Sequence, residues 1–312
     1  MSDILPLDPG MLEFNKALSA QSPPEAAAWP LDRQRAAWNA VCRKFRAPMP
    51  ESVYVEDRIL NGVPCQIFRP PGESLKPGLI YFHGGGWVLG GPDTHGDMCA
   101  EMAIGADVVS VLVDYRLAPE HPHPAQLEDS LAVLAWLRAH GAEIGMDTER
   151  IIGGGDSAGG QMTAGLSLYL RDCGLKPLAG MVLIYPVLGT DVNTPSYIRN
   201  ADAPCLTREE MIFFLDCFMG GTGSANWTNP LAAPLLAEHL SNLPPAFITV
   251  AAHDPLHDDG VMFHERLLVA GGKSELRREP ELAHSYMRAR HVSGAAMAGF
   301  RAIVAGVKRF LG

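Results

Sequence analysis

Hydrophobic residues in this chain fall into short runs that polar and glycine-rich stretches separate. The nearly unbroken apolar runs are residues 79–82, 108–113, 151–152, 181–185 and 246–251. Runs of this kind are typical of parallel strands that are buried on both faces. Segments with helical spacing lie between or after them, at residues 127–137, 162–170, 261–269 and 295–310. This alternation predicts an α/β fold with a mostly parallel central sheet and flanking helices.

Two further runs, residues 53–60 and 63–68, have β-type composition and are separated by Asn61-Gly62. An Asn-Gly pair between two such runs is the strongest short-range signal for a β-hairpin. We therefore expect an N-terminal antiparallel hairpin before the parallel strands. A last strand is expected at residues 274–278.

Two segments do not fit the alternation. Residues 1–48 show helical spacing on both sides of a break at Pro23-Pro24. Residues 188–228, which include a helical stretch at 209–218, are inserted between two predicted strands. In a parallel sheet such an insertion lies above the carboxyl ends of the strands, where ligands bind. We interpret both segments as a helical cap, with residues 49–187 and 229–312 as the two parts of the core.

Composition narrows the class of protein. The chain has 312 residues, of which 47% are hydrophobic and 19% charged, as expected for one large globular domain. A net charge of −10 argues against a nucleic-acid partner, and no apolar run is long enough for membrane insertion. The six cysteines lack C-x-x-C spacing, which indicates reduced thiols. No secretory signal is visible, so a cytoplasmic location is expected, unless a leader was removed before this numbering.

The first candidate for chemistry is Gly155-Asp156-Ser157-Ala158-Gly159, directly after the run at 151–152. It fits G-x-S-x-G, the sharp strand-to-helix turn that exposes a serine hydroxyl above a sheet. Glycines on both sides leave room for this strained turn. The following helix directs its N-terminal N–H groups at the serine, where negative charge would develop.

The same letters permit a second interpretation. Gly153, Gly155 and Ala158 occupy the positions of a dinucleotide-binding fingerprint. That fingerprint requires an acidic residue about 20 positions further on, at the end of the next strand. Asp172 lies 19 residues after Gly153 but falls within a helical stretch. The serine interpretation is therefore favoured.

A second glycine-rich loop, His83-Gly84-Gly85-Gly86-Trp87, follows the run at 79–82. This loop type supplies backbone N–H groups for the oxyanion hole of lipases and esterases. An ordinary β-α loop or a phosphate cradle is the alternative. A phosphate loop would need a nearby lysine, and none follows before Lys176. Two such motifs in the correct order favour acyl-transfer chemistry.

These motifs, together with the stretches at 114–122, Tyr185-Pro186 and Asp254-Pro255-Leu256, resemble the hormone-sensitive-lipase-like esterases, or bacterial family IV. The resemblance covers roughly residues 75–290. It implies an α/β-hydrolase fold and a serine carboxylesterase that hydrolyses short- to medium-chain esters through an acyl-enzyme. It also implies no cofactor and frequently a homodimer.

Roles for single residues follow from the order serine, acid, histidine that α/β-hydrolases use. Ser157 is the expected nucleophile, and His284, after the last strand, is the expected base. Asp254 begins the acid motif of the family and is the expected third member. The backbone N–H groups expected in the oxyanion hole are those of Gly84, Gly85 and Ala158. The aromatic residues expected to line an apolar substrate pocket are Trp87, Phe213 and Phe214.

Other polar residues receive structural interpretations. His83 is expected to brace its loop, while Asp156 and Glu120 are expected to brace loops rather than react. His264 and His291 are interpreted as packed or surface residues. Asp258 and Asp259 are interpreted as caps of the following helix. A metal site built from His253, Asp254, His257 and Asp258 lacks a second ligand cluster, so no metal is expected.

The chain departs from the family pattern at a few positions. Ser285-Tyr286 stands where Gly-Phe usually follows the histidine, His253 where glutamate is common, and Gln161 where asparagine often occurs. These departures leave substrate preference open. A formamidase, another amidase or an acyl-peptide hydrolase would use the same machinery. A non-catalytic receptor, like the gibberellin receptors that resemble this family, would lack a complete triad.

Overall fold

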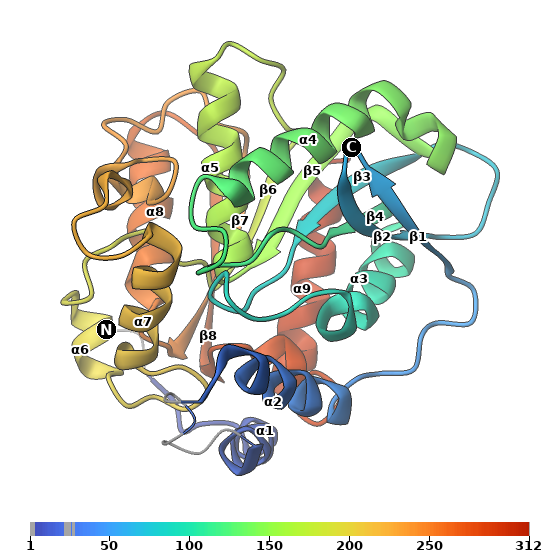
Figure 1. Cartoon of the computed structure of the whole chain (residues 1–312). Helices are drawn as coiled ribbons and strands as arrows, with labels where there is room; N and C mark the ends of the chain where they lie inside the picture. The colour runs from blue at the N-terminus through green and yellow to red at the C-terminus, as the bar shows by residue number, and fades with distance from the viewer. Residues whose placement is uncertain (1–3, 22–25, 27–28, 312) are drawn as a thin grey trace.

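The computed structural model describes residues 4–21, 26 and 29–311, so the expected break at Pro23-Pro24 lies outside the described residues. Within these ranges one eight-stranded sheet has the order β1-β2-β4-β3-β5-β6-β7-β8 (Figure 1). The strands are β1 (Tyr54–Leu60), β2 (Val63–Arg69), β3 (Lys76–Phe82), β4 (Val109–Val113), β5 (Met146–Asp156), β6 (Met181–Ile184), β7 (Ala246–His253) and β8 (Ser274–Ala283).

The pairing confirms the predicted mixture of strand directions. β1 and β2 form an antiparallel hairpin in which Leu60 faces Val63 across the turn. Asn61 and Gly62 both have positive φ, at 46° and 89°, which is the conformation that a tight hairpin turn requires. β2 also pairs antiparallel with β4, and all other neighbours are parallel.

Helices cover both faces of the sheet. The covering helices are α3 (Pro92–Ala106) and α9 (Gly294–Arg309) on one face, and α4 (Ala125–His140), α5 (Ala158–Asp172) and α8 (His257–Val269) on the other. Side chains of β3 alternate between the two layers. Leu79 and Tyr81 pack in the core cluster of α3 and α9, whereas Ile80 and Phe82 pack in that of α4 and α5. Burial on both faces explains why the strand runs are apolar throughout.

Four more helices gather at one end of the molecule (Figure 1). They are α1 (Pro9–Gln21), α2 (Leu31–Lys44), α6 (Pro195–Arg199) and α7 (Arg208–Met219). α1 contacts the inserted segment, because Asn15 Oδ1 accepts from the backbone N–H of Cys205 at 3.1 Å. From α2, Arg35 donates to the carbonyl of Val88 and pairs with Glu120 at 2.7 Å. Glu120 therefore braces the loop after β4.

Short 3-10 helices complete the described structure. They are η2 (Gly141–Ile144), η3 (Ala225–Thr228), η4 (Pro234–Leu236) and η5 (Tyr286–Ala289). None of the helices in the described ranges combines the length and the apolar character that a membrane crossing requires.

The largest departure from the sequence prediction is α3, where no helix was expected. Most residues of α3 are buried, so it lacks the polar face that produces a helical pattern in the sequence. The central strand β5 and the edge strand β8 are also longer than expected, at 11 and 10 residues. Most of their extra residues are glycine, charged or partly exposed, and therefore do not extend an apolar run.

Candidate active site

Ser157 sits in a strained turn between β5 and α5. Its φ of 56° and ψ of −117° are rare for a residue with a side chain. A Cβ on Gly155 would lie 2.4 Å from the carbonyl carbon of Gly159, and one on Gly159 would lie 1.8 Å from the carbonyl oxygen of Phe82. Only glycine fits at both positions. The backbone N–H of Ser157 donates to the carbonyl of Ile184 at 2.9 Å and fixes the turn against β6.

The structure brings Ser157, Asp254 and His284 together. Asp254 directly follows β7, and His284 directly follows β8. The Nε2 of His284 lies 3.0 Å from the Oγ of Ser157, and its Nδ1 lies 2.7 Å from the Oδ2 of Asp254. The other carboxylate oxygen of Asp254 accepts from the N–H of Leu256 at 2.8 Å. All three side chains are buried, with exposed fractions of 5%, 0% and 4%.

Two tyrosine rings support the imidazole. Tyr185 meets His284 edge-on with centroids 4.8 Å apart, and it packs against Tyr286 at 5.0 Å. The hydroxyl of Tyr286 donates to the Oγ1 of Thr249 at 3.0 Å. Between them, Ser285 has a φ of 60°, in the left-handed region that glycine adopts most easily. The chain therefore places serine in a backbone conformation that suits the usual glycine of the family.

Asp156 holds the glycine-rich loop from the sheet side. Its Oδ1 accepts from the hydroxyl of Tyr81 at 2.8 Å and from the N–H of Gly84 at 3.1 Å. Its Oδ2 lies 3.4 Å from the Nε2 of His95. The N–H of Gly84 is thus committed to a carboxylate and cannot serve as an oxyanion donor. The expectation for Gly84 was wrong, whereas the bracing role expected for Asp156 agrees with these contacts.

The ionisation of this buried group follows from its neighbours. Burial by itself would raise the pKa of Asp156, but the neighbouring His95 and Arg288 and the hydrogen bond from Tyr81 lower it overall. Asp156 therefore remains a charged acceptor at neutral pH. Burial lowers the pKa of His83 to about 3, with His95 adding to the effect. The neutral ring of His83 stacks on Tyr115 at 4.2 Å, so it braces the loop as expected.

The rest of the glycine-rich loop presents open donors. Gly85 and Gly86 have φ of 122° and 59°, values that let consecutive N–H groups turn towards one side. The carbonyl of Gly85 accepts from the N–H of Leu89 at 2.8 Å, so the loop closes on itself. Across the described parts of the chain, no hydrogen bond occupies the N–H of Gly85, Gly86 or Ala158.

The aromatic pocket candidates occupy three different environments. A Cβ on Gly86 would lie 2.3 Å from the Cγ of Phe214, so this ring rests directly on the loop. Phe213 points more outward, with 38% of its surface exposed. Trp87 is completely buried and stacks on Phe218, with centroids 4.0 Å apart and planes at 8°. Trp87 is therefore a core residue behind the loop, not an exposed pocket wall.

Asp258 and Asp259 do not cap α8. Asp259 Oδ2 accepts from the N–H groups of Leu188 and Gly189 at 2.7 and 2.9 Å. Asp258 Oδ2 accepts from the N–H of Ser196 at 2.8 Å. Both carboxylates instead hold the start of the inserted segment. Burial raises the pKa of Asp259 to about 7, and the charge of the nearby Asp254 adds to the effect, while its two backbone donors oppose it.

The other histidines have partners away from Ser157. The His253 ring lies 2.8 Å from the carbonyl of Leu5, and His257 pairs with Asp258 at 3.0 Å. His264 lies 2.8 Å from Ser274 Oγ, and His291 lies 2.9 Å from Glu101. In the described residues, no group of three or more His, Cys, Asp or Glu side chains is arranged to hold a metal ion.

Comparison with known proteins assigns this site to a family. Residues 79–288, two thirds of the chain, match the family described as alpha/beta hydrolase fold. The chain belongs to the α/β-hydrolase family. This α/β hydrolase is 43% identical over 280 residues to the carboxylesterase NlhH of Mycobacterium tuberculosis, covering 86% of this chain and 87% of that one. It is 41% identical over 249 residues to the esterase LipI of the same species, covering 78% of each chain.

Solved structures agree with the sequence relatives. An esterase of the bacterial hormone-sensitive lipase family superposes with a TM-score of 0.87 at 28% identity, covering 99% of this chain and 100% of that one. The resemblance to hormone-sensitive-lipase-like esterases is therefore confirmed. The α/β hydrolase is a carboxylic ester hydrolase that acts on small-molecule esters.

Proposed function

We propose that this α/β hydrolase is a serine carboxylesterase that cleaves short- to medium-chain esters through an acyl-enzyme. The proposal rests chiefly on the continuous hydrogen-bonded path from Ser157 Oγ through His284 to Asp254, with steps of 3.0 and 2.7 Å. A serine hydroxyl attacks an ester only if a base takes its proton in the transition state. The Nε2 of His284 is within the distance that such a transfer requires.

The steps of the reaction follow from this path. Ser157 Oγ bonds to the ester carbonyl carbon while its proton moves to His284 Nε2. As the tetrahedral intermediate collapses, the bond to the alcohol oxygen breaks and His284 gives that oxygen the proton. Water then attacks the acyl-enzyme with His284 again as base, which releases the acid and restores Ser157. Asp254 orients the imidazole and stabilises its positive charge without taking the proton.

The oxyanion of each tetrahedral intermediate would be bound by the N–H groups of Gly85, Gly86 and Ala158. The support is that these three donors have no acceptor within the described residues, while Gly84 is held by Asp156. Ala158 also lies at the N-terminus of α5, where the helix dipole favours negative charge. Each donor is typically worth roughly 3 kcal/mol in the transition state.

The expectations about the cap, the cellular location and the oligomeric state also remain proposals. We propose that residues 1–48 and 188–228 act as a cap over the core, which the grouping of α1, α2, α6 and α7 supports (Figure 1). A reducing, cytoplasmic environment is supported by the six cysteines, which are free within the described ranges. A homodimer rests only on the likeness to the family.

Replacing single residues of the path tests this function. Ser157→Ala and His284→Ala should each lower kcat on a short-chain aryl ester by about 10⁴-fold or more, with nearly equal effects because the residues act as a unit. Ser167→Ala is a matched control, since Ser167 is a buried serine of α5, the helix that follows Ser157, and its hydroxyl bonds only within α5. His264→Ala is the corresponding histidine control. Full activity in Ser157→Ala would overturn the proposal.

A further inference from the structure

The N-terminal segment, residues 4–10, contacts the last two strands of the sheet close to the points where they lead into Asp254 and His284. His253, the last residue of β7, pairs with Ala283, the last residue of β8. Each of these paired residues directly precedes a member of the triad. The position of the imidazole relative to the carboxylate therefore depends on how the ends of β7 and β8 are held together.

The pairing just before these strand ends is interrupted by a bulge. Within it, Ala252 of β7 lies opposite residues 280–282 of β8. The extra residues of a bulge lose their partners on the neighbouring strand, and the bulged strand bends. β8 is also the last strand of the sheet in the described residues, so its outer edge is not held by another strand. The end of β8 therefore needs support from elsewhere in the chain.

The N-terminal segment supplies this support through its backbone. The N–H of Leu5 donates to the carbonyl of Pro280 at 3.2 Å, and the N–H of Asp8 donates to the carbonyl of Glu281 at 2.9 Å. The ring of His253 adds a contact from β7, because its Nε2 lies 2.8 Å from the carbonyl oxygen of Leu5. A carbonyl oxygen only accepts, so the ring nitrogen is the donor. The segment thus bonds to both strands that lead into the triad.

The same segment also contacts the chain that follows His284. A Cβ on Gly10 would lie 2.4 Å from the carbonyl oxygen of Val292 and 2.7 Å from the Cβ of Ser293, so the two stretches of chain are in direct contact there. The following turns of α1 pack against η5, which lies within the same loop. The loop that carries His284 is therefore held by one segment both before and after the histidine.

We propose that the N-terminal segment and His253 form a clasp that positions the imidazole of His284 against Ser157 and Asp254. These are positioning residues, since the hydrogen bonds of the clasp go to the bulge of β8 and not to the triad side chains. The inference rests on the proposed serine mechanism, in which the imidazole must reach the serine hydroxyl. A misplacement of about 1 Å costs up to about a hundredfold in rate. The segment thus has a role in the reaction besides covering the core.

The first test is Gly10→Ala, in which the added methyl group collides with the chain after His284 and displaces the clasp. In the burst of phenol from a short-chain aryl ester, the acylation rate per active site should fall about tenfold, while the burst amplitude still equals the enzyme concentration. Gly294→Ala is the matched control, because Gly294 also lies in the first turn of a helix but a Cβ there meets nothing within 4 Å. Its acylation rate should equal that of wild type.

A second pair of variants tests the hydrogen bond from β7. His253→Ala removes the donor to Leu5 and should lower the acylation rate per active site about threefold, as expected for one hydrogen bond. The effect is smaller than that of Gly10→Ala because the backbone contacts of the segment remain. His253→Gln keeps an N–H donor near the end of the side chain and should return the rate towards the wild-type value.

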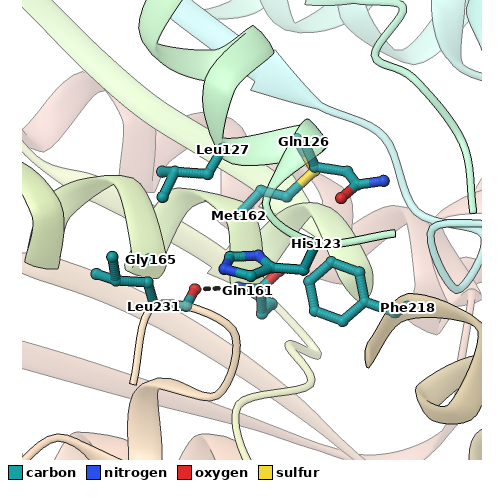
Figure 2. A pocket seen from close by; sticks show the side chains of 8 residues that line it. All are labelled: His123, Gln126, Leu127, Gln161, Met162, Gly165, Phe218 and Leu231. Atoms are coloured by element: carbon teal, nitrogen blue, oxygen red, sulfur yellow. Dashed lines mark hydrogen bonds between the residues drawn. The ribbon is translucent and has the colours of Figure 1, made fainter. Parts of the chain in front are cut away.

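A third variant measures what loss of stability alone does to the rate. Figure 2 shows Leu127 of α4 beside a cavity of about 10 Å³. Leu127 packs on the face of the sheet opposite to α1 and α9. Leu127→Ala should enlarge this cavity and lower the unfolding free energy without touching the clasp. Its acylation rate per active site should stay at the wild-type value.

An acylation rate per active site that is unchanged in folded Gly10→Ala and His253→Ala would overturn the inference. A smaller burst with an unchanged rate would overturn it as well, because the clasp would then serve stability only. An equal fall of the rate in Leu127→Ala or Gly294→Ala would have the same meaning. If Gly10→Ala does not fold, His253→Ala decides. Failure of the serine mechanism looks different, because wild type would then give no burst and Ser157→Ala would remain active.

Discussion

The α/β core and the inserted segment contact the active site through different kinds of interaction. In the core, directional hydrogen bonds fix the reacting groups: both carboxylate oxygens of Asp254 and both ring nitrogens of His284 have partners. The insertion reaches the same site through ring surfaces, with Phe214 on Gly86 and Phe218 on Trp87. Hydrogen bonds tolerate little displacement, whereas apolar packing accepts changes of volume. Chemistry should therefore depend on the core, and substrate fit on the insertion.

The two regions are joined close to the reacting residues. Asp259, five residues after Asp254, holds the N–H groups at the start of the insertion. Gln161, four residues after Ser157, holds the carbonyl of Leu231 beyond its end. Both anchors lie on the helices that begin beside the triad, α8 and α5. A change at either anchor tests whether the insertion can be disturbed while the core remains intact.

Of the two regions, the insertion is expected to give the larger effect, in Asp259→Asn. The quantity measured is the unfolding free energy as a function of pH. Because burial raises the pKa of Asp259 from 3.8 to about 7, the folded protein keeps a proton that the unfolded chain releases between these values. The stability of the wild type therefore falls as pH rises through that window and levels off above it. Across this whole pH window, the unfolding free energy of the wild type falls by on the order of 4 kcal/mol.

Asparagine keeps an acceptor oxygen for Leu188 and Gly189 but does not ionise. The unfolding free energy of Asp259→Asn, relative to wild type, should therefore increase from pH 4 to about pH 7, as measured by urea denaturation at each pH. All other titrating groups are common to both proteins, so the difference isolates this carboxyl. A difference that stays constant with pH would show that Asp259 remains ionised when folded.

A smaller effect is expected on the core side, from Asp156→Asn. The amide has one acceptor oxygen, and its NH₂ group must face Tyr81, Gly84 or His95, so the loop loses part of its support. Because the loop carries the proposed oxyanion donors, kcat should fall by about a hundredfold. Loss of a transition-state interaction should leave KM nearly unchanged.

Tyr81→Phe extends the same test. It removes one donor to Asp156 and leaves the hydrogen bond from Gly84, so its effect on kcat should be in the same direction but smaller. An increase in KM without a change in kcat, in either variant, would mean that Asp156 supports substrate binding and not the oxyanion loop.

The core was more predictable from the sequence than its connections. Strands buried on both faces produce unbroken apolar runs, and Asn61-Gly62 specifies its turn through backbone conformation. α3 gives no such signal, because burial on nearly every side removes its periodicity. Patterns of apolar residues therefore predict strands buried on both faces and helices with one apolar face. They do not predict α3, which is enclosed by the strands, α2 and α9.

For the site, the order of motifs along the chain was sufficient to select Ser157, Asp254 and His284, which the structure brings together. The sequence could not tell which glycine N–H is open, because that depends on the direction of the Asp156 side chain. It also could not tell that Asp259 reaches across to the insertion instead of capping α8. These contacts join segments that are distant in sequence, and no local spacing encodes them.

The central claim, that Ser157 carries the acyl group, is tested most directly by locating that group. Rapid mixing with a short-chain aryl ester, an acid quench and mass spectrometry of the peptides measure where the acyl group attaches. The mechanism predicts one acyl group per chain on the peptide that contains Ser157, formed together with a burst of phenol equal to the enzyme concentration. An acyl group on another residue, or the same acylation in Ser157→Ala, would contradict it.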